Sequence, residues 1–313
     1  MGRAGYIRTR LILMVFVLFG VTVLIFGLIH LIPGDPAFLL LGERATDAKA
    51  AELRTQLGLD QPLPVQYWKF ISGIPRGSFG MSLLYRQPVG DLVFRRIPVS
   101  VFVAVYAMLL AALITVPVSI YAATHRNKLG DQIVRIGFLL LFTTPGFWLG
   151  ILLILLFSLK LRLFPVAGYG ETFPAHLRYL FLPSLTLALP LSAVLIRNLR
   201  GQILDTLRAD YVRTARAKGI RERAVLTRHV LRNALVSTVT LFGLQFGNLV
   251  GGTIVVETIF AIPGMGQLIF QSITARDYPV VQAITLITAF FVIVVNLIVD
   301  LSYSFLDPRV TYG

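Results

Sequence analysis

Long apolar stretches recur along this chain and decide what it can fold into. We count six, in blocks of roughly 20 to 26 residues, which is about what a helix rising 1.5 Å per residue needs to cross some 30 Å of hydrocarbon. They lie at approximately Leu11–Ile32, Val99–Ala123, Ile133–Ser158, Leu182–Ile196, Leu235–Val256 and Val280–Phe305. This pattern predicts an all-α, polytopic membrane protein with six transmembrane helices.

The overall composition argues against an ordinary soluble domain. Of 313 residues, 56% are hydrophobic and 14% are charged, and the mean hydropathy is +0.78. Such a chain needs lipid as its solvent. The lack of cysteine excludes disulfides, thiolate metal sites and thiol nucleophiles. We expect the first stretch to stay as a span rather than be cleaved as a signal peptide, because its apolar run exceeds about 15 residues.

The basic residues predict how the chain crosses the membrane. The formal charge is +14, and on a polytopic protein orientation and anionic lipid explain such an excess before nucleic acid does. With the N-terminus in the cytoplasm, more than half of the 29 Lys and Arg residues fall inside. We therefore expect one membrane domain, 1–313, with both termini cytoplasmic, an external segment at 33–98 and a cytoplasmic loop at 197–233. No nucleic-acid partner is expected.

The external segment contains one short predicted helix. Residues Asp47–Leu57 place Ala50, Leu53 and Leu57 on one face, and Gly58 is a natural helix stop. The rings of Tyr67, Trp68 and Phe70 follow and are typical of the headgroup level. We expect this stretch to lie along the outer surface.

The loop between the fourth and fifth spans carries the string DYVRTARAKGIRERAVLTRHVLRNAL, from Asp210 to Leu235. We predict a short helix here, with Asp210 as its N-terminal cap, Tyr211 and Ala215 on one face, and Gly219 as its stop. An alanine-rich face suits contact with another protein. On charge alone, a merely basic loop or a face held to anionic lipid is about as good an explanation.

The string DYVRTARAKG resembles the coupling loop of binding-protein-dependent ABC importer permeases, in the form of the dipeptide/oligopeptide/nickel branch. With Gly219 at the glycine of the general pattern, Arg213, Thr214 and Ala215 occupy its Glu-Ala-Ala places, and Ala215, Gly219 and Leu231 match it. Three more segments carry the resemblance: HLIPGDPAFLL at 30–40, with GLDQP at 58–62; VVETIFAIPGMGQL at 255–268; and RDYPVVQ at 276–282.

The resemblance implies a B-type permease subunit with a type I ABC importer-like fold in a bacterial inner membrane. Its implied partners are a second related permease, two ATPase subunits and an external substrate-binding protein. ATP and magnesium would sit on the ATPases, leaving this chain without a cofactor. Peptides, glutathione and nickel are the implied solutes. The implied ATPase-coupling residues are Asp210, Tyr211, Arg213, Thr214, Ala215, Ala217, Lys218 and Gly219.

The residues themselves indicate that energy comes from elsewhere. No phosphate-binding loop of the G-x-x-x-x-G-K-[ST] type occurs, so power must come from a partner or from an ion gradient. An ion-coupled secondary transporter is the alternative function, but it would need ionisable groups deep in the membrane. The spans offer only Glu257 and Asp300, both near ends. We expect Asp300 to pair structurally with Arg197 or Arg200.

The fifth span and the turn after it hold candidate packing and pathway residues. Gly243, Gly247 and Gly251 form a stripe that permits close helix contact. Gln245 and Asn248 could line the pathway or bond a neighbouring helix. The irregular stretch after the fifth span could be an external gate loop or an ordinary turn. The candidate pathway or gate residues here are Glu257, Pro263, Gly264, Met265 and Gly266.

A membrane-embedded enzyme is the third possibility and has little support. The four histidines are scattered, and no H-E-x-x-H zinc pair occurs. No G-x-S-x-G elbow is present to expose a serine nucleophile. We therefore expect no catalytic residue and no metal site in this chain, and an importer that works by alternating access.

Overall fold

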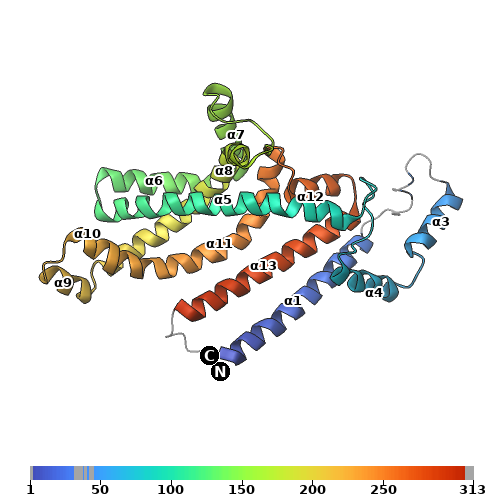
Figure 1. The fold of residues 1–313 in the computed structure, drawn as a ribbon, viewed down its shortest axis with the longest axis horizontal. Helices are drawn as coiled ribbons and strands as arrows, with labels where there is room; N and C mark the ends of the chain where they lie inside the picture. The colour runs from blue at the N-terminus through green and yellow to red at the C-terminus, as the bar shows by residue number, and fades with distance from the viewer. Residues whose placement is uncertain (1–2, 32–37, 39–40, 42–45, 307–313) are drawn as a thin grey trace. The chain divides into compact units, whose positions relative to one another are not determined.

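The structure is a computed structural model that describes residues 3–31, 38, 41 and 46–306. Within these ranges the regular structure is helical, apart from one isolated bridge between Met81 and Pro88 (Figure 1). This confirms the all-α prediction. The chain separates into two units: one runs to Val99 and includes 267–293, and the other holds 100–266 with the last helix from Val294 onward. That residues 1–313 form one membrane domain stays a prediction.

Four described helices are long and apolar enough to cross a membrane: α1 (Arg3–Leu31), α5 (Val89–Thr124), α8 (Phe173–Thr206) and α13 (Tyr278–Leu306). Two bent pairs also qualify. In the first, α6 (Leu129–Thr143) meets α7 (Gly146–Leu153) and its π-helical continuation Ile154–Lys160 at 109°. In the second, which contains α11 (Arg232–Ile259), the segments Glu222–Gly247 and Gly252–Ile259 meet at 62°. Counting each bent pair as one span gives the six that the sequence predicts.

Proline acts differently in these helices. Pro117 lies inside α5, and Pro183 and Pro190 lie inside α8, and both helices continue through them. Pro145 instead stands between α6 and α7, where the helical hydrogen bonding stops. A proline lacks the backbone N–H of the helical ladder, so the chain can turn sharply at this point.

The fourth span is far longer than its apolar core. The sequence predicted 182–196, whereas α8 runs from Phe173 to Thr206 and begins at the N-cap Thr172, whose side chain accepts from the backbone N–H of Ala175. The polar flanks around His176 and Arg200 continue the helix without adding to the hydrophobic signal. Of the four long helices, α8 is the most buried within the chain, so it forms the centre of its unit.

The described part of the external segment contains two short α-helices and a 3-10 turn at Ile74–Arg76, and α5 begins within it at Val89. α3 spans Asp47–Leu57, with Thr46 capping its start and Gly58 in the left-handed conformation at its end, as predicted. α4 (Leu63–Gly73) follows, and its Tyr67 hydroxyl bonds the Thr22 hydroxyl of α1 at 2.8 Å. Trp68 is largely exposed. The string HLIPGDPAFLL at 30–40 lies mostly outside the described residues.

Candidate coupling surface and passage

The predicted loop helix exists as α9, from Asp210 to Ala217. Its cap is Ala209 in extended conformation, with no side-chain cap bond, so the prediction that Asp210 caps the helix is wrong. Asp210 instead lies in the first turn, where a carboxylate favours the positive end of the helix dipole. Gly219 does end the helix, with φ +75° and its N–H donated to the carbonyl of Arg216 at 2.9 Å.

One side of α9 is packed against its own chain. Val212 and Ala215 are buried in a group that we call the seat cluster. Its members are Ala123, Leu199, Ile203, Val212, Ala215, Val225, Val230 and Ala234. Ala215 is only 6% exposed, so the expectation that it presents itself to another protein is wrong. A small side chain at this position allows close packing within the seat cluster.

The other side of α9 is open. The remaining seven predicted coupling residues are exposed, namely Asp210, Tyr211, Arg213, Thr214, Ala217, Lys218 and Gly219. The hydroxyl of Tyr211 accepts a hydrogen bond from the Asn233 side chain at 2.8 Å, which fixes the ring while leaving one face open. The helix therefore offers a mixed polar surface on a rigid apolar base.

An exposed ion pair closes the turn after α9. Arg216 donates to both carboxylate oxygens of Glu222, at 3.0 and 2.5 Å, across the stop at Gly219. The hydrogen bond to Glu222 raises the pKa of the Arg216 guanidinium above its ordinary value. The two side chains are 43% and 64% exposed, so solvent screens much of their attraction.

A second, buried ion pair joins α6 to α8. The guanidinium of Arg200 donates to both oxygens of the Asp131 carboxylate, each at 2.7 Å. Asp131 is 0% exposed and also accepts from the backbone N–H of Asn127 at 3.0 Å, and Arg135 lies 3.9 Å away. The sequence predicted that Asp300 pairs with Arg197 or Arg200. Arg200 pairs with Asp131 instead. The side chain of Asp300 lies outside the described residues, so its pairing with Arg197 stays a prediction.

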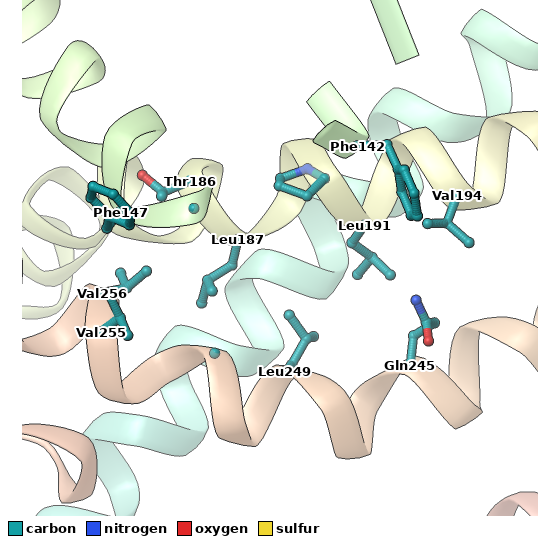
Figure 2. A pocket seen from close by; sticks show the side chains of 13 residues that line it. Phe142, Phe147, Thr186, Leu187, Leu191, Val194, Gln245, Leu249, Val255 and Val256 are labelled. Atoms are coloured by element: carbon teal, nitrogen blue, oxygen red, sulfur yellow. The ribbon is translucent and has the colours of Figure 1, made fainter. Parts of the chain in front are cut away.

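A cavity of about 450 Å³ lies where the broken span meets α8 and α11 (Figure 2). Its lining is mostly apolar and comes from four helices: Phe142 of α6; Gly146 and Phe147 of α7; Thr186, Leu187, Pro190, Leu191 and Val194 of α8; Gln245, Leu249, Gly252, Val255 and Val256 of α11. In Figure 2 the amide of Gln245 points from α11 toward α8. Gln245 and Thr186 are the two polar side chains among these lining residues.

The turn after α11 is built around a buried carboxylate. Glu257 is fully buried and accepts the backbone N–H of Gly266 at 2.6 Å, in the first turn of α12 (Met265–Thr274). A Cβ placed on Gly264 would clash with that carboxylate, and one on Gly266 would clash with the backbone of Ile254. Met265 donates its N–H to Ser100 at 2.8 Å. The turn is therefore tightly fixed in this conformation.

The string RDYPVVQ also contains a buried carboxylate. Asp277 is 0% exposed and accepts from the hydroxyl of Ser82 and from the backbone N–H of Leu84. The same hydroxyl accepts the N–H of Tyr85. The start of α13 thus holds the turn that precedes α5.

Two family models match the chain. The model described as the binding-protein-dependent transport system inner membrane component matches residues 115–312, and the model of the N-terminal part of such membrane components matches residues 4–104. This chain belongs to that family. It is a membrane-spanning permease subunit of an ABC importer, which confirms the resemblance read from the coupling loop.

Named relatives of the permease support the same conclusion. The glutathione transport system permease protein GsiC of Escherichia coli strain K12 is 42% identical over 309 residues, covering 98% of this chain and 99% of the relative. Its counterpart in Salmonella paratyphi A is 41% identical over 311 residues, with the same coverage. A crystal structure of an amino acid ABC transporter with histidines is 14% identical, with TM-score 0.54, covering 68% of this chain and 94% of that one. The last likeness supports the fold.

Other predicted site residues of the permease have mixed outcomes. Gly243 packs tightly, because a Cβ there would clash with Val299 of α13. Gly247 and Gly251 lie in α11, as does Asn248, and the side-chain surroundings of Asn248 and Gly251 fall outside the described residues. Among the residues that the structure describes, no group of three or more metal-ligating side chains occurs.

Sequence reasoning missed both ion pairs of the permease. Arg216 and Glu222 are six residues apart, on either side of a predicted helix stop, and that spacing was a usable signal. Asp131 and Arg200 are separated by 69 positions. The signal for this pair was weaker: a lone carboxylate directly before an apolar stretch, which needs a cation from another span.

Proposed function

We propose that this permease forms half of a channel with a second, related permease, and that two ATPase subunits drive the pair by alternating access. Solute arrives from an external binding protein and moves inward. In this proposal the chain lies in a bacterial inner membrane with both termini and the loop 197–233 in the cytoplasm. ATP and magnesium bind the ATPases, and this chain performs no catalysis.

The observation that carries the proposal is the two-sided character of α9. A protein that pushes on this helix meets an exposed surface around Thr214 and Lys218, while Val212 and Ala215 are packed in one buried cluster with residues of α5, α8 and the segment 225–234. Displacement of α9 must then displace the ends of two long helices, because packed interiors yield little to compression. A flexible basic loop lying on lipid would need no such seat.

The substrate class follows from the relatives and the cavity together. The curated relatives are named as glutathione transport permeases, and we propose that this importer moves glutathione or other short peptides. The cavity is large enough for such a solute, and Gln245 offers it one amide partner. An apolar wall holds a charged peptide weakly, which suits a passage that must release what it takes up.

Cross-linking from single cysteines tests the proposal cleanly, because the natural chain has none. Thr214→Cys on α9 is expected to cross-link to an ATPase subunit in the assembled importer, and to resist a membrane-impermeant thiol reagent applied to whole cells. Lys49→Cys on α3 is the matched control, equally exposed, and should react from outside without reaching an ATPase. Labelling of Thr214→Cys from the outside would overturn the orientation, and absence of the cross-link in an active importer would overturn the coupling role.

A further inference from the structure

The buried pair of Asp131 and Arg200 occupies a particular place between the seat cluster and the cavity. Arg200 directly follows Leu199 and precedes Ile203 by three positions, and both of these residues belong to the seat cluster. The last turns of α8 therefore contribute Leu199 and Ile203 to the cluster in which α9 is packed, while Arg200 binds Asp131 of α6. One short stretch of α8 serves both contacts.

The two helices that this pair joins also form two walls of the cavity. Along α6, the distance from Asp131 to the cavity residue Phe142 is 11 positions, about 16 Å at the helical rise. Along α8, the cavity residue nearest to Arg200 is Val194, six positions back, about 9 Å. The pair thus ties α6 and α8 together within a few helical turns of the walls that they contribute.

Asp131 is bound in a way that resists slippage between the two helices. Both of its oxygens accept from the planar guanidinium, and the N–H of Asn127, at a φ of +63°, adds a further bond. A two-pronged arginine pair fixes direction as well as distance, which a lysine cannot do. Without it, motion at the seat cluster could move α8 while leaving α6 behind.

We propose that Asp131 and Arg200 are positioning residues for transport: they lock α6 to α8, so that displacement of α9 moves both walls of the cavity together. The proposal rests on the proposed function of α9 as the site where the ATPases act. Neither residue is proposed to touch the solute. Their role is to convert a push on one helix into a change of the passage.

The experiment compares solute moved per ATP hydrolysed, in importers reconstituted with their ATPases and binding protein. A double variant, Asp131→Asn with Arg200→Gln, removes both charges together, so that neither is left buried alone. We expect it to assemble and to hydrolyse ATP, while the ratio of transport to hydrolysis falls at least fivefold. In Arg200→Lys, which keeps the charge but loses the two-pronged contact, the ratio of transport to hydrolysis should fall by a smaller factor. Arg135→Gln is the matched control, since it removes only the distant contact to the same carboxylate, and should keep the ratio within twofold.

Several results would overturn the proposal. If transport and hydrolysis fall in proportion to the amount of assembled complex, the pair serves folding alone, and the same conclusion follows if neither the double variant nor Arg200→Lys assembles. An unchanged ratio of transport to hydrolysis in the double variant would also overturn the proposal. The Thr214→Cys cross-link separates this failure from that of the proposed function. A normal cross-link together with an unchanged ratio in the double variant would overturn only the role of Asp131 and Arg200. A missing cross-link in an importer that keeps Asp131 and Arg200 would overturn the role of α9.

Discussion

Two arginine–carboxylate pairs of the same two-pronged geometry adjoin the seat cluster, and they differ in burial. Arg200 and Asp131 are 17% and 0% exposed and join two spans, whereas Arg216 and Glu222 are 43% and 64% exposed and close a local turn. The contact distances are alike. The contact geometry therefore does not indicate which pair contributes more to the stability of the fold.

The difference teaches that the cost of losing one partner depends on the surroundings of the other. A buried carboxylate or guanidinium left alone keeps an uncompensated charge, which is strongly destabilising. An exposed one is taken up by water at little cost. We therefore expect the loss of one partner to cost much more in the buried pair than in the exposed pair, and four tests follow from the largest effect to the smallest.

Removal of one buried partner should have the largest effect. Asp131→Ala leaves Arg200 facing its empty place, and we expect the free energy of unfolding to fall by about 3 kcal/mol or more. Thermal unfolding of the purified permease in detergent measures it. Arg135→Ala, which takes away only the contact at 3.9 Å, is the control. A loss below about 1 kcal/mol for Asp131→Ala would mean that water reaches Arg200 and that the two pairs are equivalent.

A charge placed on the buried side of α9 should come next. Ala215→Asp puts a carboxylate into the seat cluster, at a cost of about 2 kcal/mol or more. We expect α9 to leave its seat, seen as faster proteolysis of the loop and loss of bound ATPase. Ala217→Asp is two positions along on the exposed side and should leave the proteolysis rate unchanged. Equal proteolysis of both variants would contradict the two-sided arrangement.

The turn between the exposed partners should depend on its glycine more than on its ion pair. Gly219 has φ +75° and open space around it, so Gly219→Ala meets strain rather than a clash. The expected loss is about 1 kcal/mol. Hydrogen exchange of the α9 amides would detect it as weaker protection. Gly201→Ala, inside α8 with equally open space and an ordinary φ, should show no weakening there.

The exposed pair should give the smallest effect. Replacing both partners, Arg216→Gln with Glu222→Gln, is expected to cost about 0.5 kcal/mol. Raising the salt concentration should shrink even this difference, because exposed charges are screened. The measurement is thermal unfolding at low and high salt. A loss as large as that of Asp131→Ala would show that exposure is a poor guide to the worth of these pairs.

Local signals were predicted well from the sequence. Helix α3 ended at its glycine as expected, and Gly219 closed α9, because a stop depends on backbone conformation within a few residues. The cap of α9 was misplaced by one residue, since an aspartate is favourable both at the cap and in the first turn. Such boundary errors leave the element itself intact.

Long-range features were not predictable in the same way. Ala215 is buried in a cluster with residues of other helices, Leu199 and Ile203 among them, and nothing in the spacing of α9 specifies which of its faces that cluster covers. The sequence suggested Arg200 as a possible partner of Asp300, because both lie near the ends of spans. In the structure Arg200 is bound by Asp131 instead. To decide between such carboxylates one must know how the helices pack. A span that is apolar on every side has no amphipathic pattern from which its neighbours could be inferred.

The lengths of α5 and α8 have a consequence for where force can be applied. At 36 and 34 residues, each is more than about 50 Å long, whereas a bilayer measures about 40 to 45 Å with its headgroups. Where they stand near the membrane normal, both helices therefore project beyond the lipid as stalks. The seat cluster takes residues from the final turns of both helices, so in that orientation α9 lies at the ends of the stalks, where a soluble neighbour can bind it without competing with phospholipid.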